Sequence, residues 1–396
     1  MAGAAAVALA LAACAGSGGG SSKGGAGGGS SSGALPSTIK IGVPLDTSGS
    51  AQITGVGTDE KAGVDFAVKQ INDSGFLGNA KISTVEYNTQ AAKTQAVART
   101  TQLVDQDKVA AIVGYSLTPS FLAAGPIAQK AGIPVMTVGL SGAGITNVGN
   151  HIFRELLDYA NLFKIGDPQF IKATGGKTAA FLYGSDTVTT SGQYKKRKAL
   201  LEGLGIKTVA SQSITADSTN IASQLTTIKN AHPDYFVIDV DTGQVPAVLT
   251  QAASVGINAQ VLGDNGLAAK ATLSSAAASK AAQCGLFAIA WDASSTAGGN
   301  QQFVSDWKAA NGGAAPDLFN ALGRDAMWGM ATAIKQAQST NGDKITTALH
   351  ALNADLQGAL GSYKWSADGQ PTYQPLLEQI QNGKAVAWTP STTCSR

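Results

Sequence analysis

The strand that sets the fold class is Ile39-Lys40-Ile41-Gly42-Val43-Pro44-Leu45, in which the large aliphatic residues occupy every second position. Alternation with a period of two is typical of a β-strand. The segment near 59–72 follows, and Val64, Val68 and Ile71 fall on one helical stripe there. A strand that leads into an amphipathic helix is the repeating unit of α/β folds.

The same unit recurs along the chain. Short apolar runs that predict buried strands are Val109–Val113, Ile133–Val138, Ala179–Tyr183, Tyr235–Ile238, Val261–Leu262 and Leu286–Ala290. Helix-length segments between them are Thr94–Gln106, Pro119–Ala131, Tyr194–Leu204 and Val245–Val255. The alternation predicts an α/β fold with parallel sheets covered on both faces. Because the pattern restarts at Thr178, after residues 151–167, we expect two lobes with a cleft between them.

The N-terminus has the features of an export signal. An uncharged apolar segment, Ala2–Ala13, ends in Leu11-Ala12-Ala13-Cys14, and a Gly/Ser/Ala-rich stretch follows. This order predicts a signal peptide at residues 1–14 whose last residue, Cys14, is lipid-modified, and a flexible linker at residues 15–37. An Ala-rich tail would leave the position of the cysteine unexplained. We therefore expect a lipid-anchored protein on the extracytoplasmic face of the cell membrane.

Composition excludes some partners. The formal net charge is +2 and only 14% of the residues are charged, so the chain lacks the basic footprint of a nucleic-acid-binding protein. The run Lys195-Lys196-Arg197-Lys198 is interpreted as a solvated helix face. Beyond the leader, no apolar run is long enough to span a membrane, so we expect attachment by lipid alone.

The three cysteines have two different expected roles. With Cys14 assigned to lipid, Cys284 and Cys394 remain. In an oxidising, exported compartment such a pair favours a disulfide, which would attach the C-terminal tail to the strand near Leu286. Two free buried thiols are the alternative.

Catalytic and metal motifs are incomplete. The run Gly139-Leu140-Ser141-Gly142-Ala143 follows a strand, as a nucleophile elbow would, but it ends in alanine. The run before Thr178 lacks the first glycine of a phosphate-binding loop and precedes a strand. No Cys/His spacing suits zinc. We expect no enzyme, no cofactor and no metal, and a serine hydrolase that uses Ser141 remains an alternative.

Small polar residues follow the predicted strands instead. In the first lobe these are Ser116, Thr118 and Ser141, which could bind a carboxylate together with backbone N–H groups at helix N-termini. In the second lobe the strand ends carry Asp186, Asp239, Asp241 and Asp264, which could meet an ammonium or hydroxyl group. Helix capping and turn formation are the alternatives, favoured for Asp186 and Asp239.

Taken together, the chain resembles the type I periplasmic binding proteins of bacterial ABC importers, in particular the branched-chain amino acid binding group. The resemblance extends from Ile39 to Trp388. Its markers are the first strand followed by Ser48-Gly49, then Gln70-Ile71-Asn72, Glu86-Tyr87-Asn88, Gln95-Ala96-Val97, Ile112-Val113-Gly114, Ala131-Gly132-Ile133-Pro134-Val135 and Ala252-Ala253-Ser254-Val255-Gly256.

The resemblance implies two Rossmann-like lobes joined by three crossovers that close on a ligand. We expect the N-terminal lobe at 38–155 and 288–355, and the C-terminal lobe with its hinge tail at 156–287 and 356–396. The implied function is capture of a small polar ligand, an amino acid or a related amine or amide, by a monomer that delivers it to an ABC permease. A receptor of the same fold that acts on a signalling partner is the alternative.

The resemblance also implies ligand-binding positions. In the first lobe they are Ser116, Thr118, Leu140 and Ser141. In the second lobe the acidic position that receives the ligand's amine falls at Asp264 or Asn265. Positions where the family often has an aromatic residue hold Val188, and Asp241 with Thr242. The loss of two aromatic residues and the gain of an acid favour a more polar ligand than leucine.

Overall fold

The computed structural model describes residues 35–49, 51–296, 298–352, 357–362 and 364–395. The predicted signal peptide, Cys14 and most of the predicted linker lie outside the described residues. The described residues belong to one compact unit. Within the described residues, none of the helices combines the length and the apolar character that a membrane crossing needs.

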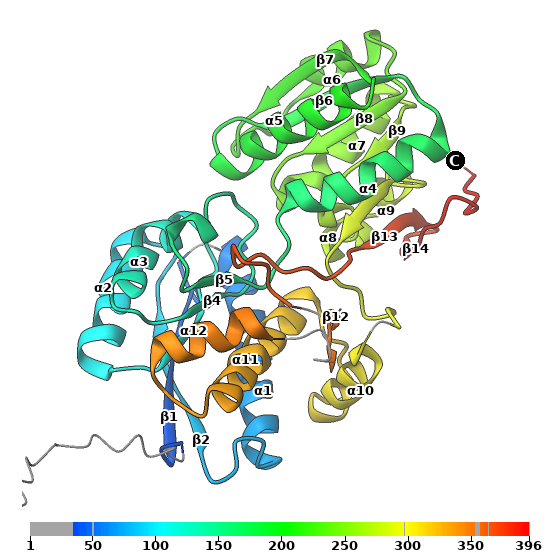
Figure 1. Cartoon of the computed structure of the whole chain (residues 1–396). Helices are drawn as coiled ribbons and strands as arrows, with labels where there is room; N and C mark the ends of the chain where they lie inside the picture. The colour runs from blue at the N-terminus through cyan, green and yellow to red at the C-terminus, as the bar shows by residue number, and fades with distance from the viewer. Residues whose placement is uncertain (1–34, 50, 297, 353–356, 363, 396) are drawn as a thin grey trace, which may run out of the picture. The chain divides into compact units, whose positions relative to one another are not determined.

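The first lobe is built on a parallel sheet of strand order β2-β1-β3-β4-β5 (Figure 1). Helices α1, α11 and α12 cover one face of this sheet, and α2 and α3 cover the other. The bounds are β1 Thr38–Leu45, α1 Ala51–Asp73, β2 Lys81–Asn88, α2 Lys93–Gln102, β3 Ala111–Gly114, α3 Thr118–Lys130, β4 Val135–Thr137, β5 Ile152–Arg154, α10 Asn300–Ala310, α11 Leu318–Ala337, α12 Gly342–Ala351, β11 Gln357–Gly358 and β12 Gly361–Ser362.

The second lobe is built on a sheet of order β14-β13-β10-β9-β8-β6-β7. Strands β6 to β10 are parallel, whereas β13 and β14 add an antiparallel edge that the sequence pattern did not predict. The bounds are α4 Tyr159–Thr174, β6 Thr178–Gly184, α5 Val188–Gly203, β7 Lys207–Ile214, α6 Ala222–Asn230, β8 Tyr235–Asp239, α7 Val245–Val255, β9 Gln260–Leu262, α8 Lys270–Ser274, α9 Ala276–Ala281, β10 Leu286–Ile289, β13 Leu376–Gln381 and β14 Lys384–Ala387. The predicted two-lobed α/β class is confirmed.

Two boundaries between the lobes differ from the expected ones. Strand β10 ends at Ile289 and belongs wholly to the second sheet, so the return to the first lobe comes after it. Leu360, Trp365 and Tyr373 are buried in the core of the first lobe, although residues 356–396 were expected in the second. The reason is apolar burial: these side chains pack with α11 and β5, and only β13 and β14 rejoin the second sheet.

The chain crosses between the lobes three times, after β5, after β10 and before β13. The first and third crossings are tied to one another. The backbone N–H of Leu157 donates to the Tyr373 hydroxyl at 3.0 Å, and the Trp365 indole donates to the Arg154 carbonyl at 2.8 Å. These bonds make the first and third connections one hydrogen-bonded unit.

The C-terminal tail is held to the second lobe by a disulfide. The Cys284 and Cys394 sulfurs are 2.03 Å apart and close a loop of sequence separation 110. Cys284 itself is buried, and Trp388 in the same tail packs edge-on against Phe170. The bridge therefore holds an edge of the sheet that non-covalent contacts also secure.

We expect the double variant Cys284→Ser, Cys394→Ser to lose about 4 kcal/mol of unfolding free energy, because a loop of roughly 100 residues regains its entropy in the unfolded chain. Urea unfolding of both proteins measures the loss. Dithiothreitol should lower the melting temperature of the parent chain and leave that of the double variant unchanged. An unchanged melting temperature of the parent under reduction would contradict the prediction.

Candidate functional site

A pocket of about 390 Å³ is lined by residues of both lobes and of the first crossing. Its volume lies in the range of small-molecule sites, roughly 300–1,000 Å³. The first-lobe lining is Lys93, Thr118, Pro119, Leu122, Ala123, Ser141, Gly142 and Ala143, the crossing adds Asp158, Tyr159 and Ala160, and α5 adds Val188, Thr189, Gly192, Gln193 and Lys196.

Four helices begin at this pocket. The first residues of α2, α3, α4 and α5 are Lys93, Thr118, Tyr159 and Val188, and all four line it. The arrangement follows from parallel sheets, because the helix after each strand starts at the carboxyl edge of the sheet. Helix N-termini carry partial positive charge and N–H groups without helical partners, so they favour an electron-rich ligand group.

The structure brings three of the predicted ligand residues together here: Thr118, Ser141 and Val188. The Thr118 hydroxyl accepts a hydrogen bond from the Gly142 backbone N–H at 3.2 Å, which fixes the loop that carries Ser141. A Cβ at position 142 would lie 2.6 Å from the Thr118 side chain, so this close approach requires glycine. Thr118 therefore positions the neighbouring loop as well as lining the pocket.

Ser116 and Leu140 are buried beside the pocket and do not line it. The Ser116 hydroxyl donates to Glu60 Oε2 at 2.5 Å and accepts from the Asp46 backbone N–H at 3.1 Å. Both of its hydrogen-bonding directions are therefore used within the protein. Burial raises the pKa of the Glu60 carboxyl to about 8, although the bond from Ser116 opposes the shift.

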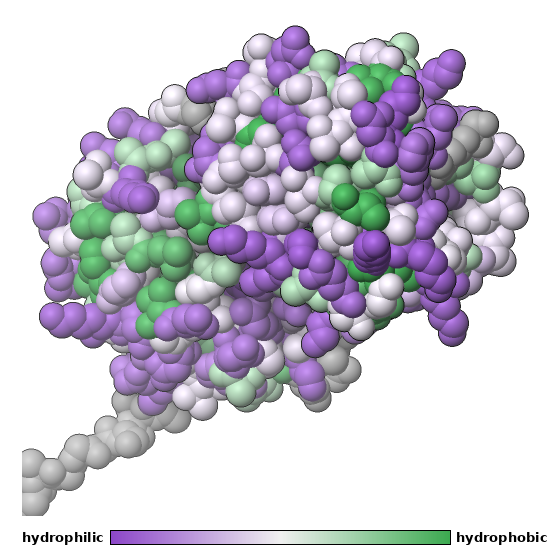
Figure 2. Space-filling view, turned by 90° about the horizontal axis from the view of Figure 1, so that it is seen from above, coloured by the Kyte–Doolittle hydropathy of each residue, from purple (hydrophilic) through white to green (hydrophobic). Residues whose placement is uncertain are grey.

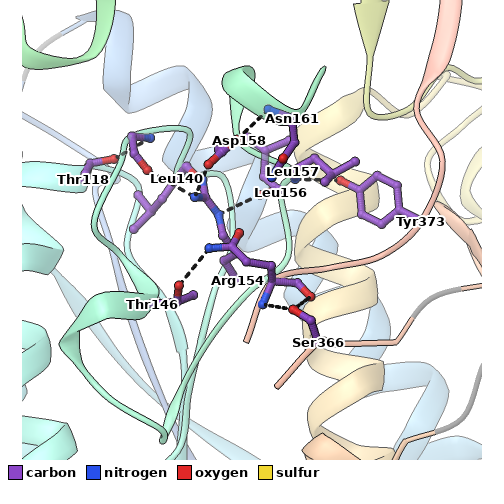
Figure 3. A network of polar contacts seen from close by, with 12 residues as sticks. Thr118, Leu140, Thr146, Arg154, Leu156, Leu157, Asp158, Asn161, Ser366 and Tyr373 are labelled. Atoms are coloured by element: carbon purple, nitrogen blue, oxygen red, sulfur yellow. Dashed lines mark hydrogen bonds and ion pairs between the residues drawn. The ribbon is translucent and has the colours of Figure 1, made fainter. Parts of the chain in front are cut away.

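Arg154 links the pocket loop to the first crossing (Figure 3). Its guanidinium donates to the carbonyls of Leu140, Gly142 (3.2 Å) and Leu156 (2.9 Å). It also lies 3.7 Å from the Asp158 carboxylate. Burial lowers the pKa of Arg154 to about 10, which leaves it charged at neutral pH. One side chain thus fixes two segments that meet at the pocket.

None of the predicted acidic residues of the second lobe is in the described lining, but Asp264 and Asp241 act electrostatically on Tyr159, which does line the pocket. The Tyr159 hydroxyl donates to Asn265 Oδ1 at 2.8 Å. Burial raises the pKa of the Tyr159 phenol, and the nearby carboxylates of Asp264 and Asp241 add to that effect. Asp264 is buried and accepts from the Gly266 N–H at 2.8 Å. Burial raises the pKa of Asp264 to about 7.

Thr242 is exposed and opens the short turn before α7. Asp241, which precedes it, is half-buried, and burial together with Asp186 raises the pKa of its carboxyl. Neither residue lines the pocket. Asp239 and Asp186 make protein contacts, to Arg197 and to the Ala216 backbone N–H respectively.

The basic run on α5 is only partly a solvated face. Arg197 is fully buried and pairs with Asp167 at 2.8 Å and with Asp239 at 3.1 Å. The interpretation of this residue as solvent-facing is wrong, because two buried carboxylates compensate its charge. Lys195 and Lys196 are exposed, and Lys198 pairs with Glu202 at 2.5 Å. Arg197 thereby holds the face of α5 that carries Gln193 and Lys196.

The histidines do not assemble a catalytic base for Ser141. The His151 Nδ1 lies 2.6 Å from the Thr346 hydroxyl, and the His350 Nε2 lies 3.2 Å from the Asn150 carbonyl oxygen. His232 occupies the turn before β8 with a φ of 44°. In the described part of the chain, no three His, Cys, Asp or Glu side chains are grouped as metal ligands.

Sequence reasoning missed Lys93, Tyr159 and Gln193, and it treated Lys196 only as part of a basic run. Lys93 and Tyr159 could have been found as first residues of helices that follow strands. Gln193 and Lys196 could not, because they lie inside α5 and reach the pocket through the orientation of that helix.

Replacement of Glu60 by Gln should make stability less sensitive to pH. The folded-state pKa of about 8 lies above the ordinary 4.5, so the unfolding free energy falls as pH rises from about 4.5 to about 8. The unfolding free energy of the Glu60→Gln variant, relative to that of the parent protein, should increase by up to about 1.4 kcal/mol per pH unit in that window. Urea unfolding at pH 5, 6.5 and 8 measures it. Exposed Glu202→Gln is the control, and a difference that is constant with pH would refute the assignment.

Replacement of Arg154 by Met should cost about 3 kcal/mol of unfolding free energy, because three carbonyls and a carboxylate lose a buried donor. Hydrogen exchange should rise selectively in residues 139–143 and 155–158. Arg99→Met is the control, since Arg99 is half-buried, donates to Gln102 of its own helix and lies over the Tyr87 ring, with no hydrogen bond to residues 139–143 or 155–158 in the described structure. Equal exchange changes in the two variants would contradict the role given to Arg154.

Residues 38–384 match the periplasmic binding protein family. A leucine-, isoleucine-, valine-, threonine- and alanine-binding protein of Pseudomonas aeruginosa is 24% identical over 350 residues, which cover 85% of this chain and 92% of that protein.

Two solved structures have a similar fold. One is the branched-chain amino acid transporter substrate-binding protein of Streptococcus pneumoniae in complex with isoleucine, with a TM-score of 0.76, 24% identity and coverage of 88% of this chain and 98% of that one. The other is an ABC transporter solute-binding protein of R. palustris in complex with benzoate, with a TM-score of 0.75, 21% identity and coverage of 88% and 95%. The chain belongs to the periplasmic binding protein family, in the type I group of two-lobed binding proteins, and is not an enzyme.

Proposed function

We propose that this protein is the extracytoplasmic solute-binding component of an ABC importer, and that it captures a small organic molecule, an amino acid or a related compound, between its lobes. The observation that carries the proposal is the pocket lined by both lobes and by the first residues of four helices. A ligand there would touch α3 and the Ser141 loop on one side and α5 on the other.

Capture between two lobes gives a permease a way to distinguish the loaded protein from the empty one. Hinge motion is the usual means, and the three crossings are the segments about which it would occur. The relatives support this role, since two of them are named as binding proteins of amino acid transport or of amino acids. The delivery partner that we propose is the permease of such an importer, with the protein acting as a monomer.

The proposed anchor is a lipid on Cys14. It is supported by the order of an apolar segment, the run Leu11-Ala12-Ala13-Cys14 and a Gly/Ser-rich stretch. Mass spectrometry of the membrane fraction should find a diacylglyceryl group on the peptide that begins with Cys14. Recovery of that peptide without lipid would reject the anchor and leave the binding function untouched.

A ligand should raise the melting temperature by several degrees when present at about 100 times its dissociation constant, a stabilisation of about 2.7 kcal/mol. We expect at least one hit in a panel of amino acids, organic acids, amines and amides. Thr118→Val and Ser141→Ala should each lower the affinity for that compound about tenfold, as measured by calorimetry, because each removes a polar lining group. Thr226→Val, at an exposed position of α6 outside the described lining, is the control. The absence of any hit would reject capture of a small solute.

A further inference from the structure

The charged groups in the pocket lining are unbalanced. Lys93 and Lys196 contribute two cations from opposite lobes, and Asp158 contributes the one carboxylate of the described lining. That carboxylate is already used: it accepts from the Asn161 backbone N–H at 2.8 Å, and Arg154 lies 3.7 Å from it. Within the described lining, the two lysines have no carboxylate that would pair with them.

The two lysines are placed where an anion would stabilise them. Lys93 is the first residue of α2, where a positive charge meets the positive end of the helix dipole. Lys196 lies between Lys195 and Arg197 on α5. Its neighbours Arg197 and Lys198 have carboxylate partners, whereas no ion pair of Lys196 is found among the described residues. An anionic ligand would offset both unfavourable placements.

Gln193 provides a second, independent indication of a ligand. Its side chain is 7% exposed, lines the pocket, and has an amide oxygen without a hydrogen-bond partner in the described structure. A buried polar group without a partner destabilises the folded protein, so a ligand that satisfies it is favoured. Because a glutamine amide can present its oxygen or its NH₂ group to the same point, Gln193 can bond a carboxylate or a neighbouring hydroxyl.

The lining also contains two exposed apolar side chains, Leu122 and Val188. Among the described residues only Leu122, Val188 and Leu204 are large hydrophobic residues with high exposure, and the first two line this pocket. Val188 is 82% exposed and Leu122 is 39% exposed, one from each lobe. Figure 2 shows, on the face seen there, hydrophobic residues in separate patches among hydrophilic ones. An apolar ligand body between Leu122 and Val188 would remove both from water.

The described lining offers an amine a single carboxylate, Asp158, which already accepts from the Asn161 N–H and lies 3.7 Å from Arg154. Asp264 and Asp241, the expected partners of an ammonium group, are not in the described lining, and Asp264 accepts a bond from the Gly266 N–H. An amino group in the pocket would face two lysines and four helix N-termini, which repel it. The charge pattern therefore selects against an ammonium group.

We propose that the ligand is a small organic acid whose carboxylate is bound by Lys93, Lys196 and Gln193 and whose apolar body lies between Leu122 and Val188, with no amino group required. This inference rests on the proposed function and specifies its ligand class. It makes Lys93, Lys196 and Gln193 the residues that determine specificity.

The test is calorimetry of the full chain with probes that share a skeleton. One set is 4-methylpentanoate, leucine and 3-methylbutylamine, and the other is 3-phenylpropanoate, phenylalanine and 2-phenylethylamine. In at least one set the acid should bind tenfold or more tightly than the amino acid and the amine. Its affinity should fall with added salt, because the contact is between opposite charges.

Variants assign the effect to residues. The double variant Lys93→Gln, Lys196→Gln should lower the affinity for the acid at least tenfold. Lys195→Gln, at an exposed neighbouring position outside the lining, should change that affinity less than twofold. Gln193→Leu should lower the affinity for the acid. It should also raise the melting temperature of the unliganded protein, because it removes a buried polar group without a partner. A merely structural glutamine would lower that temperature instead.

The outcomes separate the two proposals. Tighter binding of an amino acid or amine than of its acid, failure of both acids to bind, or equal affinity in the double lysine variant would overturn the organic-acid inference. In the first and third cases the proposed function stands, because a small solute is still bound. If the panel of amino acids, organic acids, amines and amides also gives no hit, the proposed function is rejected together with the organic-acid inference.

Discussion

The Arg154 guanidinium occupies the point where the last strand of the first sheet becomes the first crossing between the lobes. It donates to the Leu140 and Gly142 carbonyls on one side and to the Leu156 carbonyl on the other, with Asp158 nearby. The Arg154 backbone joins the third crossing through Trp365 and Gly369. The pocket loop and the first crossing therefore share the Arg154 guanidinium, and the third crossing is bonded to the backbone of the same residue. Loss of the guanidinium would leave several buried carbonyls without donors.

Arg197 has the corresponding role in the second lobe. It is fully buried and connects α5 to Asp167 of α4 and to Asp239 at the end of β8. A buried ion group of this kind contributes little net stability but fixes geometry, because any other arrangement leaves an uncompensated charge. The orientation of α5, and with it the position of Gln193, Lys196 and Val188, depends on this contact. Each lobe thus uses one buried arginine to orient its share of the pocket.

The structure brings only part of the predicted site together in one pocket. Thr118, Ser141 and Val188 meet in the pocket because Thr118 and Val188 begin helices that follow strands and Ser141 lies in the loop after β4, positions that sequence order reveals. Ser116 has the same position in the chain, yet its hydroxyl is used by Glu60, a residue of α1 that lies 56 positions away. Such a long-range partner has no signature in the local pattern of residues.

The sequence by itself determined the α/β class, the two lobes and the edge of each sheet at which polar loops gather, because these follow from local periodicity and from the handedness of strand–helix units. It also indicated Cys284 and Cys394 as a disulfide pair, and the structure joins these two residues by a disulfide. Only the tertiary structure decided that Lys93 and Lys196 share one pocket, that Asp241 and Asp264 lie outside its lining, and that Leu360, Trp365 and Tyr373 pack in the first lobe. Those outcomes depend on which distant side chains compensate buried charge and cover apolar surface, and neither is encoded within a short stretch of chain.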